Sequence, residues 1–458
     1  MTRLLIECTN VFLSPHVNTG IQRVVRNIVA HLDDVAPQEA VECIPVALGK
    51  GRLCRVLRLI PRDGDRPWPA RLYERCERAG HGLWSLNGRF EGLWPMRDST
   101  GARAALGFLL RLASLPLFTC MRLLRLLGYD PLQLRAEPFE HRAGDRLVLL
   151  DSSWHASRFP TLERLKRDGV VIVAVIHDLI PLARPEFSEA RLRSIFMAWF
   201  DWVSLQAEGF VGVSRTVREH VRAEISSRFG KKQAEARWYG YFHHGCELDL
   251  VQTDAAPPEE MLAAFASGSV YLSVGTIEPR KNHEYLLDAF EQAWAAGSNA
   301  RLCLIGRIGW KREALIGRIR SHEELGRRLF MFNDVSDSDL QYAYRNAKAL
   351  VFSSHDEGFG LPLVEAMQRG LPVMASDIPV FREIGGGYVA FFDLREPRRL
   401  AELVIEFETS GVFPAPLSLE GWHWNDWRSA CRQLVTTVLQ RGGEETAVVA
   451  DGVDARSS

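Results

Sequence analysis

Two glutamates within one short segment are the first residues whose types and spacing suggest chemistry. Residues 355–366 read HDEGFGLPLVEA and place Glu357 and Glu365 eight positions apart, around a turn that contains two glycines. The preceding residues ALVFS (349–353) form a continuous apolar run, which is typical of a buried strand. The glycine turn is therefore expected to be a strand-to-helix loop at the carboxyl edge of a sheet, where open α/β sheets bind their ligands.

The residues that follow this turn predict a helix whose beginning faces a ligand. Helix N-termini carry partial positive charge and unpaired N–H groups, so they favour anions. The N–H groups in question belong to Phe359, Gly360 and Leu361. Glu365 lies in about the first turn of the helix (362–369), where its carboxylate can accept two hydrogen bonds from a ribose diol. Glu357 precedes the turn and is expected to point freely toward the ligand. The alternative is an interaction of both acids with the helix dipole, which accounts for Glu365 but not for Glu357 and the glycines.

A second loop of the same kind carries two adjacent cations. In SVGTIEPRKNHEYLLDAF (273–290) an apolar strand leads through a glycine to Arg280 and Lys281, and a helix follows. Arginine can fork onto a phosphate, and lysine supplies a point charge. An Arg-Lys pair on its own is usually solvated surface. This pair is expected at the same sheet edge as Glu357, so the two loops together favour a site for a phosphorylated ligand.

Three motifs in the first half of the chain have a similar placement. In VIHDLIPL a buried strand runs directly into His177, a position that suits a functional histidine and a structural one equally well. In NTGIQRVVRNI, Gly20 opens a helix with Arg23 on an early turn, which predicts a second helix N-terminus facing the ligand. Ser214, in GVSRTVREH, follows another strand, and its simplest role is that of an N-cap.

Strands and helices must alternate to position these motifs, and the sequence contains two such series. In the first series, strands are expected at 4–8, 41–46, 146–151, 171–176 and 209–213, and helices at 20–33, 155–168, 188–206 and 214–228. In the second series, strands are expected at 270–274, 301–305, 328–332, 349–353 and 372–376, and helices near 283–296, 310–324, 337–346, 362–369 and 396–409. Continuous apolar strands that alternate with helices predict parallel sheets covered on both faces.

The expected fold class is therefore α/β, with two tandem Rossmann-like doubly wound domains that face each other across a cleft. The first domain is expected at 1–250 and the second at 260–415. The segment 416–441 is expected to cross back to the first domain, with a tryptophan-rich helix at about 420–440. The tail at 442–458 is acidic, small and polar, which predicts disorder.

The composition bounds the class of protein. The chain has 458 residues, more than one hydrophobic core usually holds, and its net charge of −1 argues against a general nucleic-acid binder. The eight cysteines are scattered without a C-x-x-C pair, which favours reduced, mostly buried thiols in the cytosol over a zinc site or a disulfide scaffold. The N-terminus reads as a strand and not as a signal peptide. No stretch of eighteen uncharged apolar residues occurs, so no transmembrane helix is expected.

One segment, 50–140, does not follow the alternation and is expected to be a basic, amphipathic insertion. Residues 50–128 contain 15 Lys and Arg against 6 Asp and Glu, and 101–127 contain no acid. On a helix, four arginines of this last stretch fall within an arc of roughly 100° and leave the remaining surface apolar. They are Arg103, Arg111, Arg122 and Arg125. The pattern favours an interfacial helix on an anionic membrane. The alternative is a helix hairpin that packs on the first domain, with a break at Pro116.

These residues resemble a known family. Glu357 and Glu365 form the E-x7-E pattern of the family 4 glycosyltransferases, which are retaining enzymes of the GT-B fold. The blocks TGIQRVVRNI, HDLIP, GTIEPRKN and the stretch from FNDVSDSDL to FREIGGG are similar to blocks of that family, in the same order. The resemblance covers about 1–48 and 145–440, is most specific from 270 to 393, and points to a mannosyltransferase-like branch. The insertion lies outside it.

The resemblance implies a nucleotide-sugar donor that is held mainly by the second domain. The residues implied to contact the diphosphate are Arg280, Lys281 and Gly20. Glu365 would hold the ribose, Glu357 would hold the donor sugar as a catalytic residue, and His177 would bond to a sugar hydroxyl or lie near the reacting carbon. The backbone amides implied to contact the sugar or phosphate are those of Phe359, Gly360 and Leu361. The base is implied to lie near Asn333, Val335 and Gly306.

The implied reaction is retaining transfer of a hexose to a glycan or lipid-linked acceptor in surface polysaccharide biosynthesis, with donors of the GDP-mannose or GDP-rhamnose type favoured. Two cations and two helix N-termini would stabilise the leaving diphosphate, so neither a metal nor a cofactor is expected. No partner carboxylate is evident for a double displacement. A same-face route, in which the leaving phosphate helps to take the acceptor proton, is therefore favoured.

Three alternatives stay open at this point. They are a UDP-sugar-dependent transferase of the same fold, a GT-B sugar-nucleotide epimerase or hydrolase, and a non-catalytic protein that anchors a polysaccharide complex at the membrane. The expected location is the cytoplasm, peripherally on the inner face of the plasma membrane, with the stretch 101–127 as the membrane contact. No nucleic-acid partner is expected, and the oligomeric state is left undecided.

Overall fold

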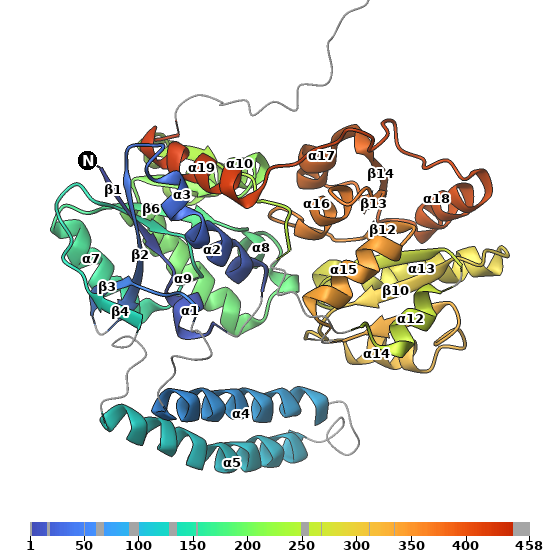
Figure 1. The fold of residues 1–458 in the computed structure, drawn as a ribbon, viewed down its shortest axis with the longest axis horizontal. Coiled ribbons are helices and arrows are strands. Elements are labelled where there is room, and N and C mark those ends of the chain that lie inside the picture. Colours follow the sequence, from blue (N-terminus) through green and yellow to red (C-terminus); the bar gives the residue numbers. More distant parts are fainter. Residues whose placement is uncertain are drawn as a thin grey trace, which may run out of the picture.

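The computed structural model describes residues 2–15, 19–49, 51–60, 68–90, 100–127, 135–152, 154–248, 256–266, 268–310, 312–333 and 335–442. These residues form two α/β domains that lie side by side, and a hairpin of two long helices that is set apart from both (Figure 1). The tail beyond 442, for which disorder was expected, lies outside the described residues.

The first domain is built on an eight-stranded sheet with the order β4-β3-β2-β1-β5-β6-β7-β8. Its strands are β1 (Arg3–Glu7), β2 (Glu42–Gly49), β3 (Arg52–Val56), β4 (Ala136–Pro138), β5 (Arg146–Leu149), β6 (Val171–Ile176), β7 (Gly209–Gly212) and β8 (Trp238–Tyr241). Six neighbouring strands of this sheet pair in parallel, in the order β2-β1-β5-β6-β7-β8, whereas β3 and β4 add an antiparallel edge. The five strands predicted for this sheet are confirmed within two or three residues at each end.

The helices of the first domain connect these strands. They are α1 (Thr9–Leu13), α2 (Gly20–Ala30), α3 (Leu32–Val35), α7 (Phe159–Arg167), α8 (Ile180–Ala183), α9 (Ala190–Gln206), α10 (Arg215–Phe229) and α11 (Lys231–Glu235). Two of them begin at caps that the sequence supplies. Thr19 and Gln22 form a capping box at the start of α2, and the Ser214 hydroxyl accepts from the Val217 N–H at 3.1 Å at the start of α10. The N-cap expected at Ser214 is therefore confirmed.

The second domain has a six-stranded, entirely parallel sheet with the order β11-β10-β9-β12-β13-β14. Its strands are β9 (Val270–Val274), β10 (Arg301–Ile305), β11 (Leu329–Phe332), β12 (Ala349–Phe352), β13 (Val373–Ser376) and β14 (Val389–Phe392). Its helices are α12 (Glu259–Phe265), α13 (His283–Ala295), α14 (Glu313–Arg320), α15 (Asp337–Asn346), α16 (Leu361–Met367), α17 (Pro379–Gly385) and α18 (Pro397–Ser410). The prediction of two doubly wound domains is confirmed, and the sheet reverses its order between β9 and β12.

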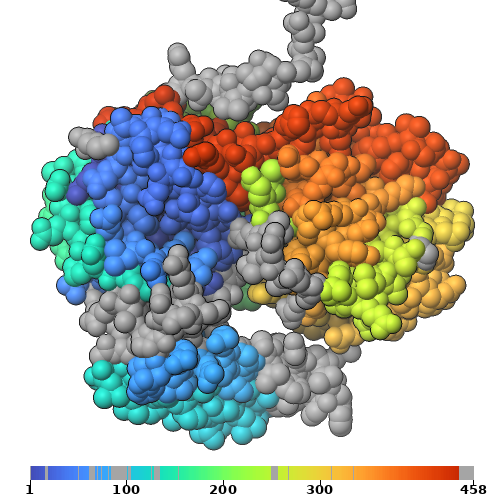
Figure 2. Space-filling view, viewed as in Figure 1, coloured from blue at the N-terminus to red at the C-terminus, as the bar shows by residue number. Residues whose placement is uncertain are grey.

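The C-terminal helix α19 (Trp427–Leu439) returns to the first domain, as expected, and Figure 2 shows it in red against that domain. Its Cys431 lies against the Ile28 carbonyl of α2, and Arg146 of β5 donates to the Val438 carbonyl at 2.6 Å. The helix begins at 427 and not at about 420, because the Asp426 carboxylate accepts from the Ser429 N–H and caps the helix there.

The insertion contains a hairpin of α4 (Trp68–Phe90) and α5 (Thr100–Leu126), which pack along each other below the first domain in Figure 1. The break at Pro116 that the alternative of a helix hairpin included was wrong, because Pro116 lies inside a continuous α5. The two ends of the insertion add β3 and β4 to the sheet, where Val56 pairs with Ala136. An edge strand needs partners on one side only, so β3 and β4 add to the sheet without disturbing its parallel centre.

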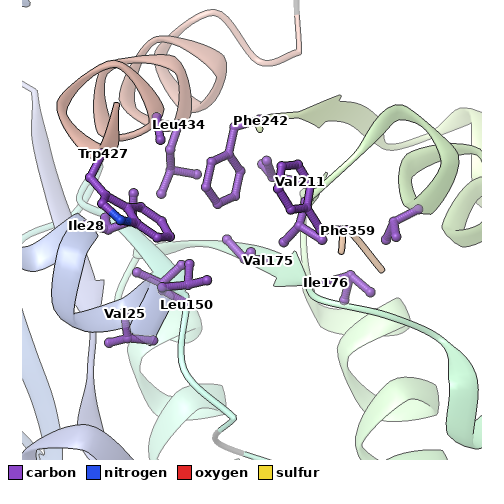
Figure 3. Close-up of a cluster of buried hydrophobic side chains, with 14 of the residues drawn as sticks. Val25, Ile28, Leu150, Val175, Ile176, Val211, Phe242, Phe359, Trp427 and Leu434 are labelled. Carbon is purple, nitrogen blue, oxygen red and sulfur yellow. The ribbon is translucent and has the colours of Figure 1, made fainter. Parts of the chain in front are cut away.

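One hydrophobic cluster runs from the first sheet through the domain interface to α19 (Figure 3). Val175 and Ile176 of β6, Val211 of β7 and Leu434 of α19 meet in this cluster, and Phe359 of the second domain inserts among them. Burial of side chains of this size contributes about 1.5–3 kcal/mol each. The cluster therefore joins the two domains by packing as well as by the chain that links them. All eight cysteines are free, as expected.

Candidate active site

The carboxyl edges of the two sheets meet directly. A Cβ atom added at Gly358 would lie 1.8 Å from the His177 carbonyl oxygen, so only glycine permits this contact. The Ser214 hydroxyl donates to the Gly358 carbonyl at 2.8 Å, and Phe187 stacks on His355 with ring centroids 5.1 Å apart. In the structure Gly358 allows the second domain to approach the strand ends of the first.

The loop after β9 and the loop after β12 bring three predicted residues together. The Glu357 carboxylate lies 2.5 Å from Arg280 Nη1 and 2.6 Å from Lys281 Nζ. It also accepts from the Ser354 hydroxyl at 2.7 Å, and Glu278 pairs with Arg280 at 2.8 Å. The expectation that Glu357 points freely toward a ligand was wrong, because the two cations expected to bind phosphate hold its carboxylate.

The pairing with two cations keeps the Glu357 carboxylate ionised. Burial by itself would raise the pKa of Glu357, but Arg280 and Lys281 outweigh burial and hold that pKa at about 2. Burial lowers the pKa of Lys281, and the Glu357 carboxylate opposes this effect. Glu357 is therefore an anion throughout the physiological range. A diphosphate that binds to these cations must compete with it or share them with it.

Glu365 is also engaged, by a residue of the opposite domain. It is the fifth residue of α16 and 2% exposed. Arg23 of α2 donates from Nη1 to one of its carboxylate oxygens, and the Tyr344 hydroxyl donates to the other at 2.8 Å. Gly20, at the start of α2, faces Leu361 at the start of α16. The two helix beginnings that were predicted separately thus lie next to each other.

The backbone amides that the sequence singled out are available. No acceptor for the N–H groups of Phe359, Gly360 and Leu361 lies within hydrogen-bond distance among the residues that the structure describes. Gly360 has a φ of +102°, which favours glycine, and this conformation turns the chain into α16. These N–H groups can donate hydrogen bonds to an anionic or hydroxyl-rich ligand. The Phe359 side chain points away into the interface cluster, 4.5 Å from the His244 ring.

His177 and Asp178 follow β6 on the opposite side of the interface. The His177 Nε2–H donates to the Leu150 carbonyl at 2.8 Å, which leaves Nδ1 with a lone pair. Burial lowers the pKa of His177 to about 4, so the ring is neutral at pH 7. Burial raises the pKa of Asp178 to about 6, although the positive charge of Arg280 counteracts it. The interaction with Arg280 places Asp178 close to the cation cluster.

A contact that sequence reasoning missed connects the domains beside this site. The Glu383 carboxylate, from α17, accepts from the backbone N–H groups of Arg215 and Thr216 at 2.7 Å each and from the Thr216 hydroxyl at 2.6 Å. It also lies 2.8 Å from His243 Nε2. These donors hold the pKa of Glu383 at about 2 although burial would raise it. The sequence gives no signal for this pairing, because the partners are at least 140 positions away.

The residues expected near the base lie at the same edge of the second sheet. Asn333 and Val335 follow β11, and Gly306 follows β10, where its N–H donates to the Phe332 carbonyl at 3.0 Å. Gly306 lies so close to the Gly275 carbonyl oxygen that a Cβ would come within 1.9 Å of it. The position is consistent with a base-binding edge, and the assignment stays a prediction.

No group of three or more His, Cys, Asp and Glu side chains is placed to hold a metal ion within the described part of the chain. Three glutamates at the site, Glu278, Glu357 and Glu365, are paired with arginine or lysine. Metal independence stays a prediction.

Comparison with known proteins identifies the second domain. A family model described as "Glycosyl transferases group 1" matches residues 262–418, which include Arg280, Lys281, Glu357 and Glu365. Residues 262–418 of the chain are thus similar to the group 1 glycosyl transferases. The E-x7-E pair and the cation pair lie within the matched residues, and the predicted resemblance to family 4 is confirmed.

Several curated relatives of the chain are mannosyltransferases. A serotype-specific mannosyltransferase of Escherichia coli is 34% identical over 307 residues, which are 65% of this chain and 37% of that protein. An O-antigen chain mannosyltransferase of the same organism is 29% identical over 273 residues, covering 58% of this chain and 68% of that protein. The chain spans just over a third of the length of the first of these relatives.

Solved structures with low sequence identity confirm the fold. A sucrose-phosphate synthase of Thermosynechococcus elongatus superposes with a TM-score of 0.53 at 15% identity, covering 96% of this chain and 99% of that one. An α,α-trehalose-phosphate synthase of Burkholderia vietnamiensis gives the same TM-score at 13% identity, covering 96% and 100%. With two parallel-sheet domains facing each other, the chain has the GT-B fold that the sequence predicted.

Proposed function

We propose that the chain is a retaining glycosyltransferase that moves a hexose from a nucleotide sugar to a glycan or lipid-linked acceptor in surface polysaccharide synthesis. The observation that carries the proposal is the cluster in which Arg280 and Lys281 hold Glu357 at the meeting edge of the two sheets. The names of the relatives support mannosyl transfer, and they favour a GDP-mannose type of donor.

The cluster has the charges that this reaction requires. Cleavage of the bond from the anomeric carbon to the diphosphate builds negative charge on the leaving group and positive charge on the sugar. Arg280 and Lys281 stabilise the leaving diphosphate. The Glu357 carboxylate stays ionised and accepts hydrogen bonds from hydroxyl groups of the donor sugar. His177 accepts a sugar hydroxyl at Nδ1, since its Nε2–H is held by Leu150. No step in this scheme requires a metal.

A panel of nucleotide sugars tests the proposal. Purified protein is incubated with GDP-mannose, GDP-rhamnose and UDP-hexoses, with and without EDTA, and nucleotide release and product configuration are followed by NMR. We expect turnover of a GDP-hexose, retention at the anomeric carbon, and no loss of rate with EDTA. Binding of none of these donors, or an inverted product, would contradict the proposal. Turnover of a UDP-sugar alone would replace the proposed donor.

We also propose that the hairpin holds the protein on the cytoplasmic face of an anionic membrane. Six large apolar side chains of α5 are between 54% and 76% exposed and fall within an arc of about 120° on the helix. They are Phe108, Leu109, Leu112, Leu115, Leu123 and Leu126. Arg111 and Arg122 flank this arc on one side, and both are exposed. The opposite face of α5 packs on α4, so the exposed apolar face has no other cover among the described residues.

By length and composition α5 includes a segment, Ala105–Leu124, that is apolar enough to cross a membrane, which the sequence-based expectation excluded. The packing of α5 on α4 favours a position of α5 along the membrane surface over one across the bilayer. Since α5 packs along α4, which contains five charged residues between 71 and 78, a spanning α5 would carry these charges into the bilayer or lose its partner helix. An interfacial α5 keeps α4 in water.

Liposome flotation tests this surface. We expect the L112E/L115E variant to lose binding to vesicles of anionic lipid, and R111E/R122E to lose the preference for anionic over neutral lipid. The matched control is V412E/L417E, which changes two exposed apolar residues of the second domain. Replacement of 59–134 by a short turn keeps the pairing of Val56 with Ala136 and removes the hairpin. Unchanged binding by this deletion would overturn the membrane proposal.

A further inference from the structure

Both carboxylate oxygens of Glu365 already accept a hydrogen bond in the structure. Arg23 of the first domain donates to one oxygen and Tyr344 of the second domain to the other, and Glu365 is 2% exposed. Because these partners and the surrounding packing cover the carboxylate, a ribose diol can reach Glu365 only if one of the two partners moves away. This question rests on the proposed function, because it assumes that a nucleotide sugar is the ligand.

Arg23 is the partner that can leave. Tyr344 belongs to α15, is 1% exposed, and packs in the same domain as Glu365, so it moves with that domain. Arg23 belongs to α2 in the opposite domain, and its side chain is 13% exposed. Its helix is fixed by the capping box of Thr19 and Gln22. The long arginine side chain can swing from this anchored helix without disturbing the cap.

Charge balance indicates where Arg23 goes. Its guanidinium stays ionised at any physiological pH, so an anion that arrives as ribose displaces it from Glu365 can replace the lost ion pair. The diphosphate of a nucleotide sugar is joined to the same ribose through one methylene group, and it brings two negative charges to the place where Arg23 is released. The guanidinium fork matches phosphate geometry. Ribose hydroxyls would then donate to the Glu365 carboxylate, and the phosphate would replace that carboxylate as the anion beside Arg23.

We propose that Arg23 is a third phosphate-binding cation, contributed by the first domain, and that it exchanges Glu365 for the donor diphosphate when the ribose binds. Arg280 and Lys281 reach the diphosphate from the second domain. With Arg23 on the opposite side, the donor is held by both domains. Arg23 is thus a binding residue, and its pairing with Glu365 holds the position that the ribose takes.

The exchange predicts opposite effects of one substitution on two ligands. In R23M, Glu365 loses its competing cation, so guanosine and uridine should bind equally well or more tightly than to the wild type. GDP and UDP lose one charge-assisted contact, so the ratio of diphosphate affinity to nucleoside affinity should fall about tenfold or more. Both affinities are measured by titration calorimetry or by competition against a fluorescent GDP, on the full-length protein.

Y344F is the matched control. It also frees one oxygen of Glu365, but it removes no positive charge, so the ratio should stay at the wild-type value. R23K keeps a point charge without the fork and should retain part of the ratio. Thermal unfolding midpoints establish that each variant is folded.

Three outcomes would overturn the inference. An unchanged ratio in R23M would mean that Arg23 does not reach the diphosphate. An equal loss of nucleoside and diphosphate affinity would mean that Arg23 only shapes the interface. A wild-type protein that binds neither GDP nor UDP would refute the proposed function itself, which separates the two failures.

Discussion

Replacement of Glu383 by glutamine tests the contact that fixes the two domains against each other. The Glu383 carboxylate accepts two backbone N–H groups at the start of α10 and one hydroxyl, and it lies against His243. Its side chain is 11% exposed, so solvent screens this contact weakly. Glutamine has nearly the same shape, but it removes the charge and turns an amide donor toward other donors.

The magnitude follows from the pKa of the carboxyl group. The four donors lower this pKa from 4.5 to about 2, against the effect of burial. A difference of this size corresponds to roughly 3 kcal/mol of stabilisation by the ionised form. We therefore expect E383Q to lower the free energy of unfolding at pH 7 by about 2–4 kcal/mol.

The difference in the free energy of unfolding between wild type and E383Q should depend on pH. A carboxyl group whose pKa is lowered on folding stabilises the folded state above its unfolded pKa and loses this effect as the pH falls through its folded pKa. The difference between wild type and E383Q should be constant from pH 7 to about 5. It should shrink between about 4.5 and 2, where the wild-type carboxylate takes up a proton.

Urea unfolding followed by tryptophan fluorescence is a suitable assay. Trp424 lies 5.4 Å from the His243 ring, so its emission reports on this interface. E402Q is the matched control, since Glu402 pairs with two arginines on the surface of α18 and should change stability by about 0.5 kcal/mol or less. The reasoning is refuted if E383Q costs less than about 1 kcal/mol at pH 7, or if the cost is the same at pH 7 and pH 3.

Three further predictions concern the site. G358A places a methyl group against the His177 carbonyl and should push the domains apart, which a larger radius of gyration in X-ray scattering would show; G317A, where a Cβ meets no neighbour, should not. E357Q should lower the transfer rate about a hundredfold or more. GDP should bind no more weakly, since Arg280 and Lys281 lose their competing anion; kcat for transfer and Kd for GDP measure the two effects separately. Burial raises the pKa of Asp178 to about 6, so its contribution to wild-type stability is lost as the pH rises from about 4 to 6. D178N should therefore be more stable than the wild type by about 1–3 kcal/mol at pH 7.5 but not at pH 4, which thermal unfolding at the two pH values measures.

Much of the fold was readable from the sequence because its signals are local. Continuous apolar runs predicted five of the eight strands of the first sheet and five of the six strands of the second. The strands that were missed are short or lie at an edge, such as β4 with three residues and β14 with four. Burial of an edge strand depends on a neighbour that is distant in sequence, so its local pattern is weak.

The sequence by itself determined which residues meet at the sheet edge. A strand that ends in Gly275 or in the HDEGFG turn must place the following loop at that edge. The spacing of Glu357 and Glu365 around a glycine turn is part of the pattern that resembles family 4. Local chemistry also determined the caps at Thr19 and Ser214, because a cap needs only residues within one turn.

Only the tertiary structure decided what each charged group does. Arg23, which pairs with Glu365, is 342 positions away from it, and Arg215, which donates to Glu383, is 168 positions away. Glu357 was expected to be free and is held by two cations. The pKa of Glu357 is low because two cations contact its carboxylate, whereas the pKa of Asp178 is raised because burial outweighs the more distant charge of Arg280. Coulomb interactions depend on that distance and on burial, and neither is a property of the linear sequence.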